Sequence, residues 1–194
     1  MGTALSAGIS AYLHTRAALR KPWLRGRTVR VFLDPTDPYS TLLAQALKRL
    51  IAVGAISDEH RLEIHVVPAP EAQFDPAPDQ RKTYARADCV RLAHQWNLDF
   101  PAAASEPPSP LFDRTVRIMS RARPPSDQLD AMVAAGAALW NADPRQLVDV
   151  VRDFGDTADS GALARGGDEL RRLGHYQGSM CCYAGEWFWG LDRL

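Results

Sequence analysis

The chain has 194 residues, 46% of them hydrophobic and 24% charged, which is typical of one folded domain with an apolar core. This composition excludes a disordered, collagen-like or coiled-coil chain. The 23 Lys and Arg equal the 23 Asp and Glu, so the net charge provides no strong attraction for a phosphate backbone or an anionic membrane. We therefore expect neither nucleic acid nor membrane as a partner.

The cysteines and the N-terminal residues predict a cytoplasmic location. Cys89, Cys181 and Cys182 are too few, and odd in number, for the disulfide framework of a secreted domain. Residues 1–20 lack the basic start and unbroken apolar core of a signal peptide, and no apolar run is long enough to cross a bilayer. Cys181 and Cys182 are neighbours in a predicted strand, so we interpret them as buried structural residues, with thiol redox chemistry as the alternative.

Hydrophobic periodicity predicts a βαβ unit after residues 1–27, which we interpret as a helical arm and linker. The apolar run at 29–33 is typical of a buried parallel strand. Pro38 suits the first turn of a helix, with Asp37 before it as the N-cap. A second strand is expected at 62–67, where apolar and polar residues alternate.

A helical block and a β-hairpin follow. The helices between residues 80 and 154 have apolar residues at helical spacing, and a less regular one contains Gly166-Gly167. We expect helices over 80–97, 111–122, 129–140, 144–154 and about 160–173, then strands at 179–183 and 186–189. This order predicts an α/β, thioredoxin-like βαβ…ββ sheet over 28–194, with an inserted helical subdomain at about 78–158.

Three blocks of residues resemble one protein family in its own order. Phe32-Leu33-Asp34 followed by Asp37-Pro38-Tyr39-Ser40 resembles the first strand and active-site turn of the DsbA-like thioredoxin superfamily. The resemblance is to 2-hydroxychromene-2-carboxylate isomerases and kappa-class glutathione transferases in particular. The other two blocks are Lys82, Tyr84, Asp88, Arg91 and Ala93 with Leu98 and Pro101, and the terminal segment 185–194, which resembles Gly-x-x-Phe-x-Gly-x-Asp-Arg.

The resemblance implies a glutathione-dependent isomerase or transferase acting on a small, aromatic molecule. In such a protein the helix N-terminus at Pro38 holds the cofactor sulfur, Ser40 donates a hydrogen bond to it, and Lys82 and Asp192 hold its charged ends. Aromatic residues at 187–189 would line an apolar pocket. The implied catalytic residues are Asp37 and Ser40, and the implied cofactor-binding residues are Pro38, Tyr39, Lys82, Ser179, Leu191 and Asp192.

The active-site turn departs from the family pattern. Redox members have Cys-Pro-x-Cys with the thiols at the positions of Asp37 and Ser40, so this chain is not a dithiol oxidase. A carboxylate at Asp37 would raise the pKa of a bound thiol by like-charge repulsion. Activation of glutathione would then require a hydrogen bond to its sulfur from Ser40, Thr36 or a protonated Asp37. Met180 replaces the proline of the family's Gly-x-Pro, and because a cis bond before Met costs about 2.5–4 kcal/mol, we expect a rebuilt loop at 178–180.

Each candidate residue also has a purely structural interpretation. Asp37 would only cap its helix, Lys82 would be solvated, and Asp88 would pair with Arg91 one helical turn away. The alternative function is therefore a non-catalytic thioredoxin-like binding or scaffold domain. The family's last helix would follow Asp192, so the end of the sequence suggests a longer protein with a further domain.

The five histidines lack metal-ligand spacing, so we expect no metal. The sequence leaves open whether the chain forms a homodimer.

Overall fold

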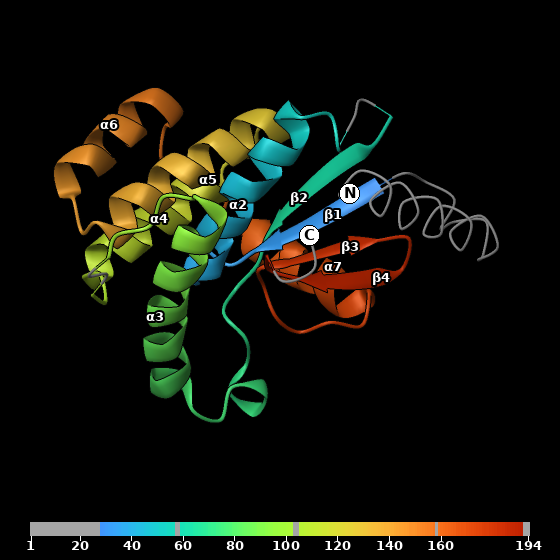
Figure 1. The fold of residues 1–194 in the computed structure, drawn as a ribbon, viewed down its shortest axis with the longest axis horizontal. Helices are drawn as coiled ribbons and strands as arrows, with labels where there is room; N and C mark the ends of the chain where they lie inside the picture. Colours follow the sequence, from blue (N-terminus) through green and yellow to red (C-terminus); the bar gives the residue numbers. More distant parts are fainter. Residues whose placement is uncertain (1–27, 57–58, 103–104, 158, 192–194) are drawn as a thin grey trace.

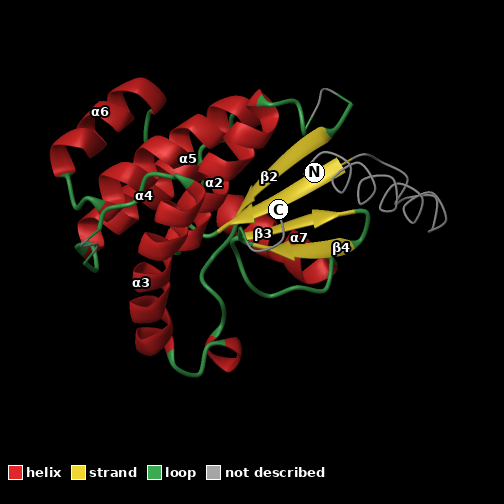
Figure 2. Ribbon diagram, in the orientation of Figure 1, coloured by secondary structure: helices red, strands yellow, loops and turns green. Residues whose placement is uncertain are grey.

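The computed structural model describes residues 28–56, 59–102, 105–157 and 159–191. The expected arm at 1–27 and Asp192 lie outside these described residues. The strands form one sheet in the order β2-β1-β3-β4, and helices cover both of its faces (Figures 1 and 2). The strands are β1 (Thr28–Leu33), β2 (Arg61–Val66), β3 (Met180–Tyr183) and β4 (Glu186–Trp189).

The sheet is mixed. Strand β1 pairs in parallel with β2 and antiparallel with β3, and β3 pairs antiparallel with β4. Val31 therefore lies between Ile64 of β2 and Cys181 of β3. Pairing continues beyond β2, since the Val67 amide donates to the Leu33 carbonyl at 3.0 Å. The predicted βαβ unit and closing hairpin are confirmed.

The helices occupy the positions that the periodicity predicts, but several begin earlier because of proline. Pro78 and Pro125 each open a helix, since proline fits the first turn, where its missing N–H has no intrahelical partner. Asp143 caps its helix and Gly155, at φ 72°, ends it. The helices are α2 (Pro38–Ala52), α3 (Pro78–Trp96), α4 (Ser109–Ser120), α5 (Pro125–Trp140), α6 (Pro144–Phe154) and α7 (Ala162–Arg172), with a 3-10 turn at Ala72–Phe74.

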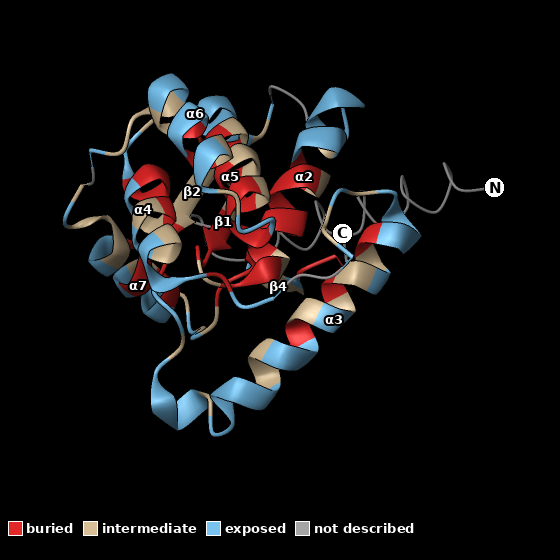
Figure 3. Cartoon of the chain, turned by 90° about the vertical axis from the view of Figure 1, so that its left-hand side faces the viewer, coloured by how far each residue is buried: buried red, intermediate tan, exposed pale blue. Residues whose placement is uncertain are grey.

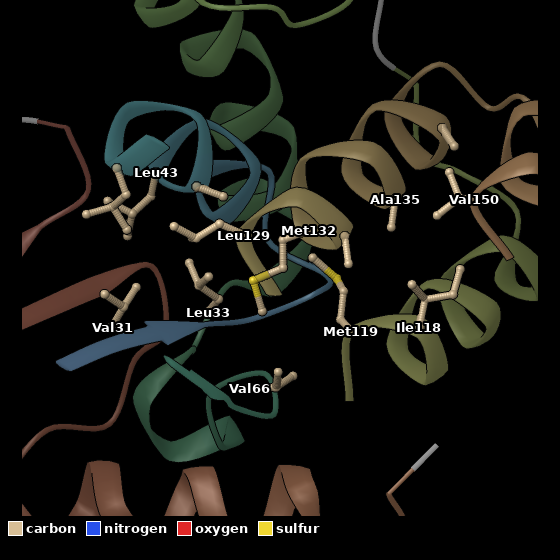
Figure 4. Packing of buried hydrophobic residues seen from close by; sticks show 14 of the residues in the cluster. Val31, Leu33, Leu43, Val66, Ile118, Met119, Leu129, Met132, Ala135 and Val150 are labelled. Carbon is tan, nitrogen blue, oxygen red and sulfur yellow. The ribbon is translucent and has the colours of Figure 1, made fainter. Parts of the chain in front are cut away.

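Alternate residues of β1 face two separate cores. Val31 and Leu33 pack with α2, α4, α5 and α6 in the larger core, shown in Figure 4. Phe32 points to the opposite face, where it packs with Leu170 of α7 and Cys182 of β3. Figure 3 shows the buried residues gathered where helices α2 and α5 meet the sheet. The parallel strand is thus buried on both faces, as its apolar sequence predicts.

Gly166 explains why a helix forms over a segment that contains two adjacent glycines. A Cβ atom at Gly166 would lie 2.0 Å from the Val66 carbonyl oxygen, so only glycine allows α7 to approach β2 this closely. Close packing against the sheet offsets the poor helix propensity of glycine. Within the described ranges, no helix has the length and apolarity needed to cross a membrane.

Candidate functional site at the start of α2

The turn between β1 and α2 is closed by its own aspartates. The Asp37 amide donates to the Asp34 carbonyl at 3.1 Å. Asp37 has extended backbone angles, φ −101° and ψ 121°, and its Oδ1 accepts from the Tyr39 amide at 3.1 Å. Asp37 is therefore the N-cap of α2, as the sequence predicts.

The loop before β3 lies directly against this turn. Ser179 has a φ of +57°, and no described residue has a cis peptide bond, so the expected trans bond before Met180 is confirmed. The Ser179 carbonyl accepts from the Gly190 amide at 2.9 Å, so this carbonyl is already paired with the end of the hairpin. A Cβ atom at Gly178 would lie 2.7 Å from the Asp34 Cβ, so glycine is needed for this approach.

Two serine hydroxyls connect the turn to the loop in a buried chain of hydrogen bonds. The Asp34 amide donates to the Ser40 Oγ at 2.9 Å, and the Ser40 Oγ lies 2.8 Å from the Ser179 Oγ. The Ser179 hydroxyl donates to the Asp37 Oδ2 at 2.9 Å. Exposure is 1% for Ser40, 0% for Ser179 and 4% for Asp37, so the chain is closed to solvent.

The donor and acceptor roles in this series of hydrogen bonds decide whether Ser40 can donate to a ligand. A serine hydroxyl carries one hydrogen, and that of Ser179 is donated to Asp37. Ser40 must therefore donate its own hydrogen to Ser179. While Asp37 is ionised, Ser40 has no hydrogen left for a cofactor sulfur.

Burial shifts the pKa values of both carboxyl groups upward. The pKa of Asp34 is raised to about 7, mainly by desolvation and then by the charge of Asp37, although hydrogen bonds from Thr36 oppose the shift. These bonds come from the Thr36 amide at 2.8 Å and its hydroxyl at 2.7 Å. Desolvation also raises the pKa of Asp37, against hydrogen bonds from Ser179 and Tyr39. Burial therefore favours the protonated form of both carboxyls, and the charge of Asp37 adds to this effect at Asp34.

Tyr39, in the first turn of α2, contacts α3. Its hydroxyl donates to the Asp88 Oδ2 at 2.8 Å, and the other oxygen of Asp88 accepts from the Arg91 guanidinium at 2.8 Å. The expected pairing of Asp88 with Arg91 is confirmed. Burial and the Asp88 carboxylate raise the pKa of Tyr39, so the phenol stays neutral.

Among the described residues, Lys82 and Leu191, which the resemblance also implies, form no hydrogen bond with the hydroxyl chain. Lys82, on the first turns of α3, is half exposed and lies 3.8 Å from Glu106. Leu191 is buried at 5% exposure and packs with Leu42 and Cys89. In the hairpin, Phe188 packs on the main core, Trp187 on the smaller core beside α7, and Trp189 is exposed.

The cysteines are structural. Cys181 packs in the main core and Cys182 in the core on the opposite face of the sheet, as the strand geometry predicts. All three thiols are free and buried, and burial raises the pKa of each one. Among the described residues no group of His, Cys, Asp or Glu could hold a metal ion.

An aromatic cavity of about 220 Å³ lies beside the first turn of α2. Thr41, the residue after Ser40, lines it together with Phe100 and Trp140, whose ring centroids are 5.8 Å apart. The Trp140 indole donates to the Thr41 hydroxyl at 3.1 Å. This cavity offers apolar walls and a few polar groups one helical turn from Asp37.

Three parts of this site are not evident from sequence patterns: the buried carboxyl of Asp34, the hydroxyl of Ser179 and the aromatic cavity. Asp34 had one available signal, since it is the polar residue directly after a buried parallel strand, where ligand sites gather in α/β sheets. The contact of Ser179 with Asp37 joins residues 142 positions apart and has no local signal.

Removing the Ser40 hydroxyl tests the chain directly. In Ser40→Ala the buried Asp34 amide loses its acceptor, and we expect the free energy of unfolding to fall by about 1–3 kcal/mol. Urea denaturation followed by circular dichroism measures it. Ser126→Ala removes an exposed hydroxyl and is the control, with an expected change below about 0.5 kcal/mol. Equal stability of the two variants would contradict a structural role for the Ser40 hydrogen bonds.

Comparison with known proteins identifies the architecture. No family model matches the chain, and no curated protein matches it. Among solved structures, a selenomethionine 2-hydroxychromene-2-carboxylate isomerase superposes with a TM-score of 0.59 over 86% of this chain and 90% of that chain, at 18% sequence identity. The chain has a DsbA-like thioredoxin fold. The mixed sheet and the helices inserted between β2 and α7 belong to this fold.

A second solved structure is similar to this chain at a lower level. It is a candidate protein disulfide isomerase from Nitrosomonas europaea, 14% identical, with a TM-score of 0.47 over 86% of this chain and 87% of that one. The superposition on the 2-hydroxychromene-2-carboxylate isomerase confirms the fold that the three sequence blocks predict.

Proposed function

We propose that this chain is a small-molecule isomerase in which the Asp34 and Asp37 carboxyl groups transfer protons. One observation carries the proposal: two carboxyls are buried together at a helix N-terminus, and the pKa of one is raised to about 7. General acid–base catalysis is most efficient when the pKa of the catalytic group is close to the working pH. Raised carboxyl pKa values of this kind are typical of functional sites.

The two carboxyls suit complementary roles. Asp37, whose charge raises the pKa of Asp34, acts as the base that accepts a proton from the substrate. Asp34, which is mostly protonated below its raised pKa of about 7, is the acid that returns a proton at a second position. The Gly178 to Ser179 loop lies against Asp34 and must move for a substrate to reach the pair. The aromatic cavity beside Thr41 supports a small, aromatic substrate.

Glutathione, the cofactor that the resemblance implies, fits this turn poorly. The hydrogen of Ser40 is donated to Ser179, and the Thr36 hydroxyl donates to Asp34. The Ser179 carbonyl is held by Gly190. A charged Asp37 would also disfavour a thiolate by like-charge repulsion. We therefore derive no step through glutathione.

An assay of 2-hydroxychromene-2-carboxylate isomerisation, followed by absorbance with and without reduced glutathione, tests the proposal. This substrate is the one named for the structural relative. We expect turnover without glutathione, and a loss of at least about 100-fold in kcat for Asp37→Asn, which keeps an N-cap but removes the base. Asp149→Asn, an exposed carboxylate on α6, is the control with unchanged turnover. Turnover by Asp37→Asn equal to that of the parent would refute the role of Asp37.

The second candidate function is a non-catalytic binding or scaffold domain. It is favoured by the closed hydroxyl chain, whose members are at most 4% exposed. Thermal-shift titration with reduced glutathione of the parent and of Asp37→Ser distinguishes it. Parent turnover that is absent under all conditions, together with a thermal shift in Asp37→Ser alone, would mean that the fold has kept a cofactor pocket and lost its chemistry.

A further inference from the structure

A second cavity, of about 210 Å³, lies at the open edge of the sheet and shares no residue with the carboxyl pair. Strand β2, the edge strand, forms one wall through 64–66. The segment that joins α4 to α5 forms the second wall, and the start of α7 forms the third. None of these residues has a part in the proposed isomerase chemistry.

Two helices begin at this cavity. Pro125 and Gln128 of α5 line it, as do Ala162 and Gly166 of α7. Neither helix has a side-chain hydrogen bond at its N-cap. At α7 the Asp159 carboxylate and carbonyl already accept from the Gly161 and Ala162 amides. The remaining N–H groups of the first turns, together with the positive ends of both helix dipoles, favour an anion here.

Ser120 gives an independent indication of a ligand. It lines the cavity, is only 5% exposed, and its Oγ has no hydrogen-bond partner in the described part of the chain. His65 Nε2, at the opposite wall, is likewise buried without a partner. Leaving a buried polar group unpaired costs about 1–3 kcal/mol, so a bound acceptor would relieve a real cost.

The charged side chains around the cavity leave a surplus of positive charge. Arg165 is paired with Asp159, the acidic residue among those that line the cavity. Arg123 donates to the carbonyls of Ile118 and Phe154 at 2.7 and 2.9 Å, so its charge meets no carboxylate there. Within the described residues the Arg121 guanidinium has no ion pair or hydrogen bond, and it lies against Gly155, between this cavity and an adjoining one that Arg121 also lines.

Carbonyl groups at the end of α4 and nearby carboxylates would repel an anion, but hydrogen bonds and ion pairs offset both. The C-terminal carbonyls of α4 point toward this region, but Arg123 and Gln128 already donate to those of Ile118 and Met119. Three carboxylates, Asp127, Asp130 and Asp153, line an adjoining cavity that shares Arg121 and Arg123. Asp130 pairs with Lys48 and Asp153 pairs with Arg152, which leaves Asp127 to offset the two arginines.

The geometry points to an oxyanion-binding site here, in which Ser120, Arg121 and the N-termini of α5 and α7 bind a small phosphate or carboxylate. Isothermal calorimetry and thermal shift on the whole chain test it, with inorganic phosphate and acetate as probes at constant ionic strength. We expect saturable binding of at least one probe. Arg121→Gln should weaken it at least tenfold, and Arg152→Gln, an exposed arginine of α6 paired with Asp149, should leave it unchanged.

Ser120→Ala separates binding from folding. Because the Ser120 hydroxyl is unpaired, its loss should raise the melting temperature without phosphate and reduce the further rise that phosphate causes. Tighter binding of phosphate or of acetate identifies which oxyanion the site prefers. Absence of saturable binding by either probe, or binding that Arg121→Gln leaves unchanged, would overturn the proposal.

Discussion

Asp34→Asn is expected to stabilise the protein by about 2–4 kcal/mol at pH 8 and by much less at pH 4. The pKa of Asp34 is raised from 3.8 to about 7 in the folded state, so the native protein holds its proton more tightly than the unfolded chain. Stability therefore falls as pH rises from about 4 to 7, and the full cost is present above pH 7. Asparagine keeps the oxygen that accepts from Thr36 and removes the titrating charge.

Urea denaturation of the parent and the variant at pH 4, 6 and 8 measures this difference. Asp149→Asn is a suitable control because Asp149 is exposed on α6, and we expect it to change stability by less than about 0.5 kcal/mol at each pH. A gain for Asp34→Asn that is the same at pH 4 and pH 8 would contradict a buried carboxyl with a raised pKa.

Gly166→Ala is expected to lower the free energy of unfolding by about 3 kcal/mol. Its Cβ would lie 2.0 Å from the Val66 carbonyl oxygen, which belongs to the backbone of β2 and cannot move aside without disturbing the sheet. Helix α7 would have to shift away from the smaller core around Phe32 and Leu170. Chemical denaturation measures the loss.

Gly161→Ala is the matched control at the start of the same helix. Its Cβ would lie 2.5 Å from the end of the flexible Arg165 side chain, which can move, and at an ordinary contact distance of 3.6 Å from Asp159 Oδ1. We expect a change within about 0.5 kcal/mol. If Gly166→Ala is as stable as Gly161→Ala, the close packing of α7 on β2 is not required for the fold.

Local sequence patterns account for most of the architecture. The apolar run at 29–33, the Asp37-Pro38 helix start and the alternation at 62–67 each follow from short-range rules, and each is confirmed. Helix starts are less exact, because apolar periodicity begins only where a helix meets the core. The α3 and α5 helices begin earlier, at Pro78 and Pro125.

The candidate site was predictable only in part. Asp37 as N-cap, the trans bond before Met180 and the buried cysteines follow from local chemistry. The hydroxyl chain does not, because it depends on the pairing of β3 beside β1, which brings Ser179 next to Ser40. The raised pKa of Asp34 likewise depends on how completely tertiary packing removes water from the turn.

The central claim is that Asp34 and Asp37 form a buried pair that holds a proton near neutral pH. Carbon-13 NMR of the aspartate carboxyl groups, titrated from pH 3 to pH 9 in the parent and in Asp37→Asn, tests it most directly. We predict that Asp34 titrates near pH 7 in the parent and at lower pH in Asp37→Asn, because the neighbouring charge is gone. Titration of Asp34 near pH 4 in the parent would contradict the account.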